Sequence, residues 1–90
     1  MKKKIQVEEV ENEGLIALLG KRVLLMSAGY FYEGELDGVN EQCVKIKNPH
    51  IVYSTGDWSD SEYSDIQKMH IEEWYVSIGL IESFGISKNE

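Results

Sequence analysis

Cysteine, proline and long apolar runs are nearly absent from this sequence. Cys43 is the single cysteine, so the chain forms no internal disulfide and shows no sign of an oxidising compartment. No apolar run approaches the roughly 20 residues that a membrane-spanning helix needs. The lysines at 2–4 precede glutamates, where a signal peptide would have its apolar segment. We therefore expect a cytoplasmic protein that does not enter a membrane.

Positive charge is also scarce, and this bears on the kind of partner that the protein has. Nine lysine and arginine residues stand against sixteen aspartate and glutamate residues, which gives a net charge of −7. Proteins that bind nucleic acids draw much of their affinity from cations that displace counterions from phosphates. The charge of this acidic protein therefore favours protein partners or self-assembly.

The length and composition predict one small globular domain. Apolar residues make up 42% and charged residues 28% of the chain, a balance typical of folded domains. A chain of 90 residues buries a limited core, which association with other subunits commonly supplements. We predict a single domain with its core at 14–78, an N-terminal arm at 1–13, an acidic loop at 54–65 and a C-terminal tail at 79–90.

The first half of the chain predicts a short helix followed by strands. Leu15, Leu18 and Leu19 share one face of a helix at 13–20, and Gly20 occupies the position of a C-terminal cap. The apolar run at 23–26 predicts a buried strand, followed by a turn at Ala28-Gly29. In the arm, Ile5 and Val7 alternate with polar residues; we expect a frayed end, with a short edge strand as the alternative.

The next two strands follow an alternating pattern. From Tyr30 to about residue 36 we expect Tyr32, Gly34 and Leu36 on one face and Glu33, Glu35 and Asp37 in water. Gly34 lies mid-strand, where it permits a sharp bend or a close backbone approach. A polar turn leads to a third strand that begins near Gln42 and is interrupted at Asn48-Pro49.

The second half predicts further extended segments around one loop. Extended structure resumes at 51–53, and the loop carries four acidic residues and no basic one. Strands are then expected at 66–71 and at 75–78, the second being the last strand. Part of the tail is expected to pack on the domain or on a neighbour, because it contains Leu80, Ile81, Phe84 and Ile86.

The order of these features resembles the Sm-like (LSm) family over about residues 14–78. Leu-Leu-Gly-Lys-Arg-Val at 18–23 and Gly-Glu-Leu-Asp-Gly-Val-Asn-Glu-Gln-Cys at 34–43 match its first motif. Ile-Glu-Glu-Trp-Tyr-Val at 71–76 keeps the frame of its second motif, with Glu72-Glu73 in place of Arg-Gly. The resemblance implies a mainly β fold: a small, strongly bent five-stranded SH3-like or Sm-like barrel with a short N-terminal helix. It also implies a homo-oligomeric ring of five to eight subunits.

The same resemblance implies a site for uridine-rich RNA in the pore of the ring. The matching positions are Asn40, Gln42 and Val44, with Glu72 where the family has arginine. Val44 cannot hydrogen-bond with a base edge, and Glu72 places an anion beside the phosphates. We therefore expect a degraded pocket. The candidate nucleic-acid-binding residues are Asn40, Gln42, Lys45 and Lys47, with the N-terminal lysines as further cations.

Ring formation in this family joins the fourth strand of one subunit to the fifth strand of the next. The strands expected at 66–71 and 75–78 have apolar edges that invite such pairing. The candidate interface residues are Ile66, Met69, Ile71, Tyr75, Val76 and Ile78.

Several residues admit two interpretations. For Lys45 and Lys47 we favour cross-strand pairing with Glu33, Glu35 and Asp37 over a phosphate track. For the acidic loop we favour a solvated connection over a calcium site, because the spacing of calcium loops is missing. Trp58 and Tyr63 in that loop anchor it to the domain or contact a partner. Trp74 and Tyr75 are expected to cover a barrel end or subunit seam.

The first hypothesis is a non-enzymatic Sm-like ring with an assembly or scaffold role, no cofactor and no metal. Cys43 is expected to be a half-buried small apolar residue, because neither His50 nor His70 lies in a catalytic motif. One alternative is a ring that binds RNA through Asn40 and Gln42. The other is a monomeric SH3-like module that binds a peptide through Trp58, Tyr63 and Trp74.

Overall fold

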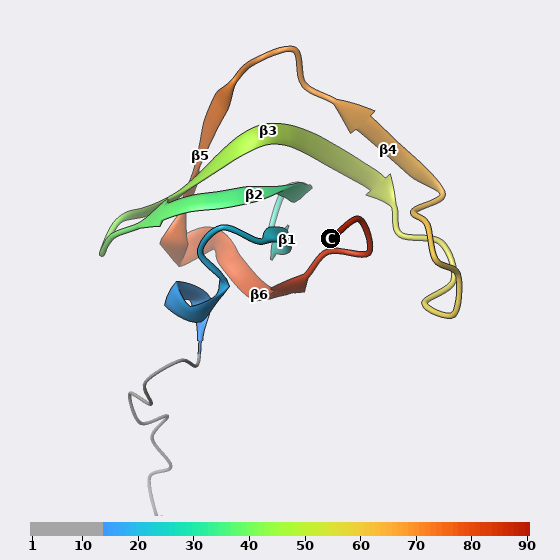
Figure 1. The fold of residues 1–90 in the computed structure, drawn as a ribbon, viewed down its shortest axis with the longest axis horizontal. Coiled ribbons are helices and arrows are strands. Elements are labelled where there is room, and N and C mark those ends of the chain that lie inside the picture. The colour runs from blue at the N-terminus through green and yellow to red at the C-terminus, as the bar shows by residue number, and fades with distance from the viewer. Residues whose placement is uncertain (1–13) are drawn as a thin grey trace, which may run out of the picture.

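The computed structural model describes residues 14–90, which form six strands and two 3-10 helices (Figure 1). The helices are η1 (Leu15–Leu18) and η2 (Ile78–Leu80). The strands are β1 (Arg22–Ser27), β2 (Phe31–Val39), β3 (Cys43–Ser54), β4 (Asp65–Lys68), β5 (Glu73–Ser77) and β6 (Ile81–Ile86). The prediction of a mainly β fold is confirmed. The predicted arm at 1–13, including its possible edge strand, lies outside the described residues.

All six strands belong to one antiparallel sheet that is organised around β3. The first half of β3 pairs with β5 and the second half with β4, while β2 pairs along the other side. Figure 1 shows β3 as a long arch, with β5 over its first half and β4 over its second half. The order continues from β2 to β1 and β6, and no ladder in the described part joins β6 to β4 or β5. The sheet is therefore bent but not closed, unlike the predicted five-stranded barrel.

A bulge produces the bend in β3, where the sequence predicted an interruption at Asn48-Pro49. The pairing of β2 with β3 shifts register between Glu33 and Glu35, opposite this dipeptide. Asn48 has a φ of 49°, and its N–H donates to the Glu72 carbonyl at 3.0 Å. A proline within a bulge removes no regular ladder bond, so the strand continues through it. The predicted interruption is therefore a distortion within one strand.

Gly34 makes the close approach that its position in the strand predicted. A Cβ atom at this residue would lie 2.9 Å from the Lys47 carbonyl oxygen and 3.2 Å from the Ile46 Cβ. Any larger residue would push β2 away from β3 at the bulge. The bend of the sheet therefore depends on a glycine here.

Side chains of β1 contribute to two apolar clusters, one on each face of the strand. The larger cluster contains Val23, Leu25, Leu36, Val44, Ile46 and Val76. The smaller cluster contains Leu24, Val52 and Tyr63. β1 has four successive apolar residues because each of its two faces packs against one of these clusters.

Three predicted boundaries differ from the structure. The predicted helix at 13–20 is a single 3-10 turn, although Gly20 follows it with a φ of 86°, as a residue after a helix end often does. The predicted strand at 66–71 ends at Lys68. The segment at 75–78 is not the last strand, because the tail forms β6 and pairs with β1. The described residues contain no helix long and apolar enough to cross a membrane.

Candidate assembly edges and buried polar network

The two ends of the sheet are candidate assembly edges. β4 and β5 pair only with β3, and β6 pairs only with β1, within the described residues. Among residues 14–90, each of these strands therefore has one side without a strand neighbour. Unpaired backbone donors and acceptors at such a side form a template for another strand.

Apolar side chains accompany the free edge of β6. Phe84 pairs in register with Leu25 and Ile86 with Val23, so both lie on the same face of the sheet as these two core residues. Phe84 is nevertheless 43% exposed and Ile86 49% exposed. An exposed apolar strip beside an unpaired strand edge is typical of a surface that another chain covers.

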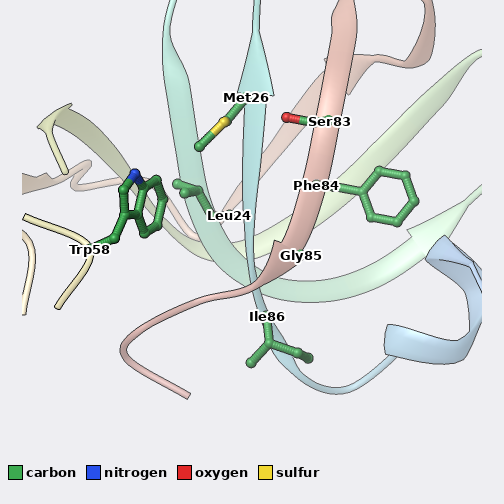
Figure 2. Close-up of a pocket in the computed structure, with 7 residues that line it drawn as sticks. All are labelled: Leu24, Met26, Trp58, Ser83, Phe84, Gly85 and Ile86. Carbon is green, nitrogen blue, oxygen red and sulfur yellow. The ribbon is translucent and has the colours of Figure 1, made fainter. Parts of the chain in front are cut away.

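A shallow hollow of about 200 Å³ lies against β1 and β6. Its lining residues are Leu24, Met26, Trp58, Ser83, Phe84, Gly85 and Ile86 (Figure 2). In Figure 2, Trp58 lies on the side of Leu24 and Met26, whereas the Phe84 ring points away. A Cβ atom at Gly85 would meet nothing within 4 Å. The small residues of β6 therefore leave room beside Trp58 for an apolar side chain.

The predicted interface residues have different surroundings in the structure. Ile66 of β4 packs on the smaller cluster, and Ile78 packs on the larger one. Met69 lies between β4 and β5, outside both strands. Two candidates have large exposed surfaces, Ile71 at 49% and Tyr75 at 58%, whereas Val76 is buried in the core.

The two predicted base-binding residues lie at the turn between β2 and β3. The Asn40 Oδ1 atom accepts hydrogen bonds from the N–H groups of Gln42 at 2.7 Å and Cys43 at 2.8 Å. Gln42 has an exposed side chain, and its carbonyl accepts a bond from the Ile78 N–H at 2.9 Å. Asn40 therefore has a structural role in closing the turn.

The two predicted basic residues are held by carboxylates. The Lys45 Nζ atom lies 2.8 Å from Glu73 and 3.3 Å from Asp37, and the Lys47 Nζ atom lies 3.5 Å from Asp37. Hydrogen bonds to Glu73 and Asp37 raise the pKa of Lys45, and the bond from Lys45 lowers the pKa of Asp37. Cross-strand pairing with Asp37 is confirmed, but Glu73 takes the place predicted for Glu33 and Glu35.

Glu33 is the residue that the alternating pattern placed wrongly. It was expected in water, yet it is fully buried, and Arg22 binds both of its carboxylate oxygens. Burial alone would raise the pKa of Glu33, but hydrogen bonds from Arg22 and Ser87 outweigh it and lower the pKa. The alternating pattern assumes that one face of the strand is exposed to water. In the structure the smaller cluster and the tail cover that face as well, so Glu33 is buried.

The last residues of the chain complete this buried network. The Ser87 hydroxyl donates to the Glu33 carboxylate at 2.6 Å. The Tyr63 hydroxyl lies 3.1 Å from the Ser87 hydroxyl oxygen. The Lys88 N–H donates to the Tyr63 oxygen at 3.1 Å, and the Arg22 N–H donates to the Glu90 carboxylate. The tail therefore joins β1, β2 and the acidic loop. Of the two loop aromatics, Tyr63 anchors the loop, while Trp58 remains 61% exposed.

The residues considered for catalysis or metal binding do not converge. Cys43 begins β3 and His50 lies seven residues along it, which separates them by roughly 20 Å in extended chain. His50 lies beside the buried network, its Nδ1 atom 2.9 Å from the Asn48 carbonyl oxygen. Residues 14–90 contain no group of three or more histidine, cysteine, aspartate or glutamate side chains that is arranged to hold a metal ion.

Comparison with known proteins gives no relative, because no family model, curated protein or solved structure matches the chain. Over residues 14–90 the structure defines a mainly β domain with one bent antiparallel sheet, whose two ends have no strand neighbour within this range.

Proposed function

We propose that this protein is an Sm-like subunit that assembles with copies of itself into a ring and serves as a scaffold. The observation that carries the proposal is the position of the free edges, with β4 and β6 at opposite ends of one sheet. When one edge of a subunit pairs with the other edge of the next, the contact is head-to-tail. Such contacts close into a ring when the rotation between subunits allows it.

The proposed contact joins β4 of one subunit to β6 of its neighbour. From the sequence we expected contact between the strands at 66–71 and 75–78. In the structure β6 is the final strand, so it takes the place of the segment at 75–78 in the proposed contact. Covering the exposed halves of Phe84 and Ile86 would contribute about 1 kcal/mol each. Each new backbone hydrogen bond would contribute roughly another 1 kcal/mol.

Several observations argue against RNA as the main ligand. Asn40 is engaged by backbone N–H groups, and Lys45 and Lys47 lie beside carboxylates. With a net charge of −7 on each subunit, a ring would repel a polyanion. We therefore propose that the ring binds RNA weakly at the pore positions.

A monomeric peptide-binding module is the second candidate, and Trp58 favours it. This side chain is 61% exposed at the rim of an apolar hollow. Exposed tryptophan is enriched at protein interfaces. The two candidates differ in the mass of the protein in solution.

Variants at the edge test the proposed ring. Replacing Phe84 and Ile86 by lysine places charges on the free edge, where they oppose strand pairing. The double variant F84K/I86K is expected to run as a monomer in light scattering, with the circular dichroism of a folded β protein. Tyr30→Lys is the matched control, because Tyr30 is 52% exposed but lies in the turn between β1 and β2. A ring that survives in F84K/I86K would contradict the proposed contact.

A further inference from the structure

The acidic loop surrounds the end of one lysine side chain. The Lys88 Nζ atom donates to the carbonyl oxygens of Thr55 at 3.0 Å, Asp57 at 2.9 Å and Glu62 at 3.3 Å. A primary ammonium has three N–H donors, so these three acceptors satisfy all of them.

Two aromatic rings complete the surroundings of this ammonium group. The Nζ atom of Lys88 lies 5.2 Å from the centre of the Trp58 ring and 5.4 Å from that of Tyr63. Cations within about 6 Å of an aromatic face are attracted by its quadrupole. Carbonyl oxygens and aromatic faces together form what we call the ammonium cage, made by Thr55, Asp57, Trp58, Glu62 and Tyr63.

The loop has hydrogen bonds of its own that shape the cage. Asp57 accepts from the Ser59 N–H through its carboxylate at 3.1 Å and from the Asp60 N–H through its carbonyl at 3.0 Å. Gly56 has a φ of 69°, a conformation that a larger residue adopts only with strain. A Cβ atom there would also lie 2.3 Å from the Ser64 hydroxyl oxygen. These contacts do not involve Lys88, so they shape the part of the loop around Gly56 and Asp57 independently of it.

Charge also favours a cation at this place. The bonds from the Ser59 N–H and hydroxyl to Asp57 lower the pKa of this carboxyl, and the nearby Lys88 charge acts in the same direction. Four acidic and no basic residues occur between positions 54 and 65. At neutral pH the carboxylates therefore give the loop a negative charge, and the carbonyl oxygens add partial negative charge at the cage.

We propose that this loop is a binding site for primary alkylammonium groups, of which the lysine side chain is one, and that Lys88 is its intramolecular occupant. Lys88 then blocks the cage from within the same chain, and a lysine of another molecule competes with Lys88 for it. The hydrogen-bonding requirement sets the specificity. A quaternary ammonium ion keeps the cation–π attraction but has no N–H group to donate to the carbonyls.

Removal of the occupant tests the proposal by chemical rescue. The variant Lys88→Ala is expected to melt several degrees below the wild type and to lose the cation from the face of Trp58. Addition of n-butylammonium chloride, which has the four-carbon chain of lysine, is expected to restore most of the melting temperature and to change the tryptophan fluorescence. Both responses should saturate with concentration, as binding to the folded state requires.

Matched salts and variants isolate the cage. Tetramethylammonium chloride and sodium chloride at equal ionic strength are expected to give no saturable response. Wild-type protein and the variant Lys47→Ala should respond only at much higher butylammonium concentrations than Lys88→Ala, because Lys88 occupies the cage in both. Equal responses to the three salts, or a response of Lys47→Ala as large as that of Lys88→Ala, would overturn the proposal.

Two further measurements keep the proposal testable if Lys88→Ala does not fold. Lys88→Met retains an unbranched apolar side chain without the ammonium group, and the same salt series applies to it. In wild-type protein, proton NMR should show the Lys88 Hε resonances shifted upfield by the two rings, whereas those of Lys21 should have ordinary values. Unshifted Lys88 resonances would refute the cage directly.

Discussion

Disruption of the buried ion pair between Arg22 and Glu33 should be among the most damaging single changes to this protein. Glu33 has no exposed surface, whereas the Arg22 side chain is 24% exposed. Removal of one partner of a buried pair leaves the other charge without compensation, which typically costs about 3–5 kcal/mol. The two single variants should therefore differ in severity according to which charge remains.

Arg22→Met leaves the carboxylate of Glu33 fully buried, so we predict a loss of about 4 kcal/mol in the free energy of unfolding. Glu33→Gln leaves the partly exposed guanidinium, which also contacts the Asn48 carbonyl at 3.1 Å, so we predict a loss of about 2–3 kcal/mol. For a domain of this size, each kcal/mol shifts the melting temperature by roughly 4–8 °C.

Urea and thermal unfolding at pH 7 and one protein concentration, followed by circular dichroism, provide the measurement. The double variant R22M/E33Q should lose less than the sum of the single losses, by about 1.5 kcal/mol or more, because it contains no uncompensated charge. Additive losses, or Glu33→Gln more damaging than Arg22→Met, would refute this account of the network.

Three further predictions concern pH, packing and the turn. The pKa of Glu33 in the folded protein is below its ordinary value of 4.5, so its contribution to the free energy of unfolding is complete above pH 4.5 and is lost as the pH falls through the folded pKa. In urea titrations from pH 7 to 3, the free energy of unfolding should therefore fall less in Glu33→Gln than in the wild type. Gly34→Ala should cost about 1–3 kcal/mol in urea unfolding, whereas Gly85→Ala, which has open space, should change stability by less than about 0.5 kcal/mol. Asn40→Ala should lower stability by about 1–2 kcal/mol and leave oligo-uridine binding, measured by fluorescence anisotropy, unchanged; a large fall in uridine affinity would restore Asn40 as a base-binding residue.

Local sequence signals were enough to predict the beginning of the sheet. The apolar run at 23–26 corresponds to β1, the alternation after Tyr30 to β2, and the mid-strand Gly34 to the close approach of β2 to β3. The loop between β3 and β4 covers 55–64, so the predicted acidic loop at 54–65 also includes the last residue of β3, Ser54, and the first residue of β4, Asp65. These features depend on residues that are neighbours along the chain or across one hairpin.

Features that depend on distant residues could not be predicted in the same way. Glu33 accepts a hydrogen bond from Ser87, which lies 54 positions away, and nothing near Glu33 in sequence signals this contact. The apolar residues of the tail predicted that it packs on the domain or on a neighbour. Its pairing with β1 could not be predicted, because the two strands are far apart in the sequence. The one local hint was β1 itself, whose apolar residues on both faces indicated cover on the side where Glu33 lies.

The mass of the protein in solution tests the central proposal most directly. Size-exclusion chromatography with light scattering, on wild-type protein at several concentrations, should give a single species of roughly 50–80 kDa, which corresponds to five to eight chains of 10.3 kDa. A single species at the mass of one chain at every concentration would contradict the ring and favour the peptide-binding module.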